Sequence, residues 1–143
     1  MLTWAEKYTN IPYKLFGNSP QQGMDCFNLV VYIFQDKLKI DIPYKSSDFL
    51  KIVDEAWFEK THEEHFLNGS QNGDWIEVNE LQPFDLIVMC LGSTNVCNHV
   101  AMYIGDNKII QMMQNRPSGI YKYHRYYQQY TVKKVRWKNL KNY

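Results

Sequence analysis

The chain has 143 residues, of which 45% are hydrophobic and 22% charged, and its formal net charge is +1 at pH 7. These values are typical of one soluble globular domain, expected here over residues 1–143. The low net charge argues against nucleic acid as a partner, and no apolar run is long enough to insert into a membrane. The N-terminus carries Glu6 and Lys7 and lacks the pattern of a cleaved export signal.

The N-terminal half has helical patterns. Residues Thr3 to Asn10 are compatible with a short helix, and the chain breakers between Pro12 and Gly23 indicate a loop. From Met24 to Lys39 the apolar residues recur on one helical face, with Asp25 as the expected N-cap. A second amphipathic helix is predicted from Ser47 to His65.

The C-terminal half changes to strand patterns. Strands are predicted at Trp75–Val78, Asp85–Met89, His99–Ile104, Lys108–Met112 and Tyr130–Trp137. The segment Gly105-Asp106-Asn107 is typical of a hairpin turn. Because helices precede strands along the chain, we predict an α+β fold with an antiparallel sheet.

The cysteines do not resemble a disulfide framework. Cys26, Cys90 and Cys97 are odd in number and irregularly spaced, which favours free thiols and a reducing compartment. Cys90, Cys97 and His99 could suggest a metal site. Their spacing matches no zinc pattern and no fourth ligand stands out, so we expect no metal there.

Cys26 is the candidate nucleophile. It lies at the predicted start of a helix, where unpaired backbone N–H groups and the helix dipole favour an anion. A cysteine attacks acyl carbons as a thiolate, and a downstream histidine such as His99 could act as its base. These two residues alone do not exclude the simpler interpretation of Cys26 as a small buried hydrophobic residue.

Four blocks in the same order resemble the NlpC/P60 family of cysteine peptidases. They correspond to a Pro-Tyr element, the Asp-Cys-x-x-Leu-Val motif, the entry to a central strand and a His-Val block: Ile11–Tyr13, Gly23–Val30, Leu81–Leu86 and His99–Gln111. The resemblance implies a papain-like NlpC/P60 fold, in which the central antiparallel sheet packs against the helix that carries the nucleophilic Cys26. It implies a peptidase that needs no metal or other cofactor.

The resemblance also implies roles for individual residues. Cys26 would be the nucleophile, His99 its general base, and Gln111 the residue that orients the imidazole. The backbone N–H of Cys26 and the Tyr13 hydroxyl would stabilise the oxyanion. Residues at the oxyanion or the substrate would be Tyr13, Asp25 and Phe27. The implied substrate is a peptidoglycan stem peptide, cleaved next to D-Glu and a diamino acid.

The flanking segments resemble the phage tail-tip assembly branch of this family. Phe27 follows the cysteine, Phe84 stands where the family has glycine, and Asn115–Ser118 resembles a Gly-Arg-x-Ser block. This branch implies docking on tail-tip or hub proteins, in the virion or in the host cytoplasm during assembly. Two alternatives stay open: a structural tail-tip protein of the same fold with little or no activity, and an amidase or acyltransferase for another substrate.

Aromatic residues offer further candidate surfaces. The tyrosine-rich stretch Tyr121–Tyr130 could stack bases or sugars, although a docking surface or an edge strand is the favoured interpretation. Three tryptophans could line a glycan groove, but core packing is the simpler prediction for each: Trp4, Trp57 and Trp75.

Overall fold

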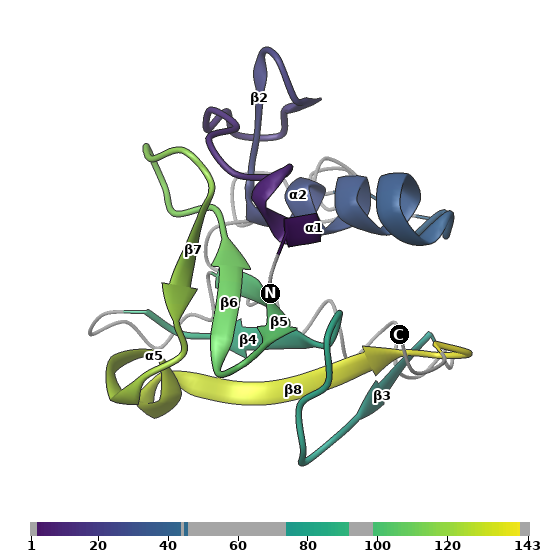
Figure 1. The fold of residues 1–143 in the computed structure, drawn as a ribbon, viewed down its shortest axis with the longest axis vertical. Helices are drawn as coiled ribbons and strands as arrows, with labels where there is room; N and C mark the ends of the chain where they lie inside the picture. The colour runs from purple at the N-terminus through teal and green to yellow at the C-terminus, as the bar shows by residue number, and fades with distance from the viewer. Residues whose placement is uncertain (1–2, 44, 46–73, 92–98, 141–143) are drawn as a thin grey trace, which may run out of the picture.

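The computed structural model describes residues 3–43, 45, 74–91 and 99–140 (Figure 1). Its helices are α1 (Thr3–Glu6), α2 (Cys26–Ile33), the π-helix η1 (Phe34–Leu38) and α5 (Arg125–Gln129). Its strands are β1 (Asn18–Ser19), β2 (Gly23–Met24), β3 (Trp75–Glu77), β4 (Leu86–Met89), β5 (His99–Gly105), β6 (Lys108–Gln111), β7 (Gly119–Lys122) and β8 (Thr131–Trp137). The predicted α+β class is confirmed, whereas the helix predicted from Ser47 to His65 lies outside the described residues.

The central sheet has six strands in the order β3-β8-β4-β5-β6-β7. Every neighbouring pair is antiparallel, as predicted. Met89 lies opposite His99 and Gln111 opposite Gly119, so both candidate residues are at strand ends. The predicted β5–β6 turn is also present, with Asp106 and Asn107 at φ values of 51° and 59°, as a hairpin turn of this type requires.

Alternating side chains give the sheet two apolar faces. Leu86, Val88, Val100 and Met102 point toward α2 and belong to the larger core cluster. Their neighbours on the opposite face pack with Tyr123 and with Tyr127 of α5: Ile87, Met89, Ala101 and Ile109. Figure 1 shows α1 and α2 together on one side of the sheet and α5 beyond the end of β7. Helix α2, which begins at Cys26, therefore packs on one face of the sheet, and the α5 residue Tyr127 packs on the other.

The helix that begins at Cys26 follows the sequence prediction closely. The Asp25 carboxylate caps it by accepting a hydrogen bond from the Asn28 backbone N–H at 2.9 Å. A second 2.9 Å bond from the Phe16 N–H ties the preceding loop to the same carboxylate. The helix continues as the π-helix η1, which ends at Leu38, and the C-cap residue Lys39 has a left-handed φ of 59°.

Several local predictions need correction. Helix α1 ends at Glu6, not at Asn10, which has a left-handed φ of 63°. The loop predicted from Pro12 to Gly23 contains the first strand of the small β1–β2 hairpin, and Tyr13 forms an isolated bridge with Met24. In the tyrosine-rich stretch, β7 is an edge strand of the sheet, which confirms that interpretation for its first residues.

Trp4 and Trp75, which were predicted to pack in the core, both contact it. Trp75 is buried against Trp137, with ring centroids 5.0 Å apart. Trp4 is half-buried and lies on Phe84, with centroids 4.7 Å apart. The φ of Phe84 is 78°, a conformation that costs a non-glycine residue about 1–2 kcal/mol. The burial of its ring against Trp4 offsets this cost. Trp57 lies outside the described residues.

The prediction of free thiols is wrong for Cys90, which is disulfide-bonded, whereas Cys26 forms no disulfide. Cysteine count and spacing did not reveal this bond, because pairing depends on Cα positions that only the fold determines. Cys97 lies outside the described residues. Within the described ranges, no group of three or more His, Cys, Asp or Glu side chains could hold a metal ion. No helix in this part of the chain is both long and apolar enough to span a bilayer.

Candidate active site

Cys26 is the first residue of α2 and is partly exposed. Three backbone N–H groups lie close enough to its sulfur to favour the thiolate, those of Val100, Phe27 and Cys26 itself. Burial has a larger effect in the opposite direction and, together with the Asp25 carboxylate, raises the pKa of the Cys26 thiol to about 12. The resting group at neutral pH is therefore the thiol.

His99 and Gln111 form a buried pair at adjacent strand ends. The distance between His99 Nε2 and Gln111 Oε1 is 2.7 Å, and the two residues are only 4% and 1% exposed. An amide oxygen can only accept, so His99 Nε2 donates and its Nδ1 is the unprotonated, basic nitrogen. Burial lowers the pKa of His99 to about 4, although the hydrogen bond to Gln111 acts in the opposite direction. At neutral pH the imidazole is uncharged.

Packing of α2 on β5 brings the thiol to the histidine strand. The two elements are in direct contact, although they are far apart in the sequence. The Val100 N–H that lies near the Cys26 sulfur belongs to the peptide bond immediately after His99. This backbone group has no side-chain signature, so sequence reasoning could not have identified it. The Val100 N–H is a hydrogen-bond donor from the sheet, in addition to the N–H groups of Cys26 and Phe27 at the start of α2.

Tyr13 belongs to the segment that precedes β1, and its side chain lies near Cys26. Burial, followed by the charges of Asp25 and Cys26, raises the pKa of its phenol, so the hydroxyl is near both residues and stays protonated at neutral pH. Two backbone bonds hold this segment to β2, from the Met24 N–H to Pro12 O at 3.0 Å and from the Lys14 N–H to Met24 O at 2.9 Å. The loop thus presents Tyr13 next to the start of α2.

Comparison with known proteins identifies the family. The model of the NlpC/P60 family matches residues 10–136. The chain belongs to the NlpC/P60 family. Members of this family are cysteine peptidases, and the papain-like α+β fold expected from the sequence is the fold observed.

Two curated relatives match most of this NlpC/P60 chain. The murein DD-endopeptidase MepH of Escherichia coli K12 is 30% identical over 100 residues, which cover 70% of this chain and 30% of that protein. The gamma-DL-glutamyl hydrolase of Bacillus subtilis 168 is 26% identical over 107 residues, which cover 75% of this chain and 21% of that protein. The chain thus spans less than a third of the length of either relative.

Solved structures give the same fold. A NlpC/P60 family protein from Bacillus cereus ATCC 10987 has a TM-score of 0.63 and 24% identity, with 95% of this chain and 39% of that chain covered. The NlpC/P60 domain of the peptidoglycan hydrolase SagA has a TM-score of 0.56 and 21% identity, with 94% of each chain covered.

Phe27 and Asp25, two of the site residues that the resemblance implies, have side chains that already serve the fold of this NlpC/P60 chain. The Phe27 ring is 1% exposed and packs in the core, so its backbone N–H is the part that faces the Cys26 sulfur. A substrate contact by the Phe27 ring is therefore not supported. The Asp25 carboxylate is 4% exposed and already accepts two backbone hydrogen bonds, so its first role is to cap α2 and hold the loop.

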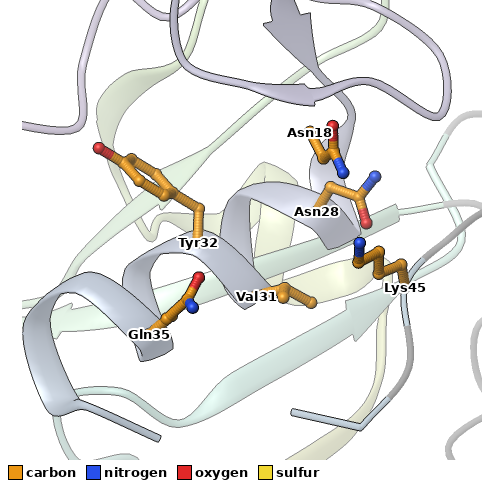
Figure 2. Close-up of a pocket in the computed structure, with 6 residues that line it drawn as sticks. All are labelled: Asn18, Asn28, Val31, Tyr32, Gln35 and Lys45. Carbon is orange, nitrogen blue, oxygen red and sulfur yellow. The ribbon is translucent and has the colours of Figure 1, made fainter. Parts of the chain in front are cut away.

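A cavity of about 100 Å³ lies on the outward side of α2, away from the sheet (Figure 2). Four of its residues come from one stripe of α2 and its continuation, and β1 and Lys45 complete it: Asn18, Asn28, Val31, Tyr32, Gln35 and Lys45. Neither Cys26 nor His99 lines it. Sequence reasoning did not single out this cavity, and it is separate from the thiol.

Proposed function

We propose that this chain is a cysteine peptidase that hydrolyses peptide bonds in peptidoglycan stem peptides. One observation carries the proposal: the partly exposed Cys26 thiol, which forms no disulfide, lies at a helix start beside the peptide bond that follows His99, and Gln111 holds that imidazole. The names of the curated relatives, a murein endopeptidase and a glutamyl hydrolase, support this class of substrate.

The first half-reaction forms a thioester. The Cys26 sulfur attacks the carbonyl carbon, and the thiol proton passes to Nδ1 of His99. The Cys26 N–H and the Tyr13 hydroxyl are candidate donors to the resulting oxyanion. When the intermediate collapses, the C–N bond breaks and the amine leaves with the proton from His99. Water then attacks the thioester through the same base and releases the acid and the thiol.

Proton transfer is coupled to attack in this mechanism. A pKa of about 12 for Cys26 and of about 4 for His99 means that both groups are neutral before substrate binds. The charges of the imidazolium and the oxyanion therefore develop together, next to the backbone N–H groups at the start of α2. Gln111 holds the ring so that Nδ1 is the nitrogen that receives the proton.

Digestion of purified peptidoglycan tests the proposal. We expect the wild-type chain to release new amino and carboxyl ends, which mass spectrometry of the soluble muropeptides locates to one bond. Cys26→Ala should release none, while its circular dichroism spectrum matches the wild type. Equal release by the two proteins would contradict a thiol mechanism. The products also distinguish an endopeptidase from an amidase or a glutamyl hydrolase.

The proposed setting is the tail tip of a phage particle, where the chain would dock on tail-tip or hub proteins before it acts. The likeness of Phe27 and Asn115–Ser118 to that branch supports the setting. Mass spectrometry of purified tailed particles from the source culture should detect the chain. Its absence from the particles and from their assembly intermediates would contradict this setting without affecting the hydrolase. A purely structural role is disfavoured because the Cys26 thiol is partly exposed.

A further inference from the structure

Ser118 is a buried hydroxyl outside the proposed chemistry. It immediately precedes β7, at the end of the connection that follows Gln111, and is 2% exposed. A buried hydroxyl needs partners for both its donor and its acceptor capacity. Both partners of Ser118 come from a single segment, residues 8–11, which lies far away in the sequence.

Four hydrogen bonds connect Ser118 to that segment. Its Oγ donates to the Tyr8 carbonyl at 2.6 Å and accepts from the Ile11 N–H at 3.0 Å. Its backbone N–H donates to Ile11 O at 2.9 Å, and its carbonyl accepts from the Asn10 N–H at 2.9 Å. The hydroxyl therefore reinforces a backbone pairing that exists without it, and it fixes the angle at which the two segments meet.

The two segments lead to opposite sides of the proposed site. Gly119, the residue after Ser118, lies opposite Gln111, which holds His99. Ile11 lies two residues before Tyr13, whose segment pairs with the chain leading into Cys26. One continuous set of contacts thus runs from the thiol side to the imidazole side, and Ser118 is the point where the two sides join.

We infer that Ser118 is a positioning residue, whose hydroxyl sets the geometry between Cys26 and the His99–Gln111 pair. This inference rests on the proposed function. Nucleophilic attack depends on reacting atoms within a narrow range of distances, and a misplacement of about 1 Å can cost about 100-fold in rate. Ser118 does not touch the substrate and acts through the two segments that it joins.

Paired variants test the hydroxyl itself. Ser118→Thr and Ser118→Val give side chains of nearly the same shape. Threonine adds one methyl group and keeps the hydroxyl, whereas valine has a second methyl group in place of the hydroxyl. We expect kcat of the valine variant to be about 10- to 100-fold below that of the threonine variant, with KM within about 3-fold. Equal kcat values in two folded variants would overturn the inference. Ser118→Ala, which adds no methyl group, replaces valine if that variant does not fold.

Thr131 provides a matched control. Its hydroxyl also makes two hydrogen bonds, to the Tyr123 hydroxyl at 2.6 Å and to the Tyr127 carbonyl at 3.0 Å, but it serves the α5 side of the sheet. Thr131→Val should lower the melting temperature and leave kcat unchanged. A loss of kcat in Thr131→Val as large as in Ser118→Val would mean that general destabilisation explains both, and would overturn the inference.

A spectroscopic measurement separates this inference from the proposed function. The His99 Nε2–H proton, hydrogen-bonded to Gln111, should give the same NMR signal in wild type and Ser118→Thr, and should shift or exchange rapidly in Ser118→Val. If the wild type hydrolyses no peptidoglycan, the proposed function fails, and this measurement still decides whether Ser118 positions His99. An unchanged signal in the valine variant would contradict the positioning role.

Discussion

Two polar pairs of the sheet region, each with a buried residue, are built in opposite ways. Asp85 is fully buried and accepts three hydrogen bonds, from Nε and Nη2 of Arg136 at 2.8 Å each and from the Gln82 N–H at 2.7 Å. His99 and Gln111 share one hydrogen bond, and Gln111 Nε2 has no hydrogen-bond partner within the described part of the chain.

The difference separates a structural pair from a reactive one. Buried polar groups that only support a fold are normally satisfied, because each unmade hydrogen bond costs stability. The carboxylate of Asp85 is satisfied in this way and has little capacity left for chemistry. The His99 imidazole keeps a basic nitrogen, although burial disfavours its charged form.

The largest effect is expected at the reactive pair. His99→Gln keeps a buried amide but removes the base, so kcat for peptidoglycan hydrolysis should fall by about 10²–10⁴-fold. The free energy of unfolding, measured with urea, should change by only about 1 kcal/mol. Activity within a factor of about 10 of the wild type would remove His99 from the mechanism.

The structural pair should show the opposite response. Arg136→Met leaves the Asp85 carboxylate buried without its cation, and should lower the free energy of unfolding by about 3–5 kcal/mol. At temperatures where the variant is folded, kcat should equal that of the wild type. Lys138→Met is the control, because the Lys138–Asp74 pair is more exposed and should cost less than about 1 kcal/mol. Similar losses in both variants would contradict the contrast.

Acid should destabilise the protein through His99. Burial lowers the pKa of His99 from 6.5 in the unfolded chain to about 4 in the folded protein, so the unfolded state binds more protons between these values. The free energy of unfolding should therefore fall by about 3 kcal/mol as the pH decreases through this range, while above pH 6.5 the full contribution is present. Urea titrations of wild type and His99→Gln isolate the effect. Parallel curves for the two proteins would contradict it.

The smallest effect concerns the shared hydrogen bond. Gln111→Glu places a carboxylate against the Nε2–H of His99 in nearly the same shape, and a nearby negative charge favours the imidazolium. We expect the His99 pKa, followed by NMR, to rise by about 1 unit or more. Gln111→Met, with a similar length but no charge, should not raise it. A pKa unchanged in the glutamate variant would mean that Gln111 does not determine the protonation of His99.

Local signals in the sequence were sufficient for the main elements. The Asp25 cap and the apolar stripe after Cys26 depend on neighbours within a few residues, and the structure has both. The Asp106–Asn107 turn was predictable because these residue types tolerate left-handed φ values. The helix at Arg125–Gln129 was not predicted, because it is short and its burial depends on Tyr127 packing against a distant sheet face.

Long-range contacts at the site could not be predicted from residue patterns alone. Residue patterns describe one segment of the chain at a time. They therefore do not reveal three features that depend on the fold: the disulfide of Cys90, the Val100 N–H near the thiol and the Ser118 contacts to residues 8–11. The core position of the Phe27 ring was missed for a related reason. Its place after the nucleophile suggested a substrate contact, whereas the helical face it occupies directs it into the core.

The sequence by itself determined the α+β class, the start of the Cys26 helix and the residue types available for chemistry, because propensity, capping and periodicity act over a few residues. Only the tertiary structure decided the protonation states of Cys26 and His99, since burial is a property of the packed fold. The tertiary structure also decided that Asp85 has its hydrogen bonds satisfied while His99 keeps a basic nitrogen. The reason is that their hydrogen-bond partners come from segments that are distant in the sequence and meet only in the fold.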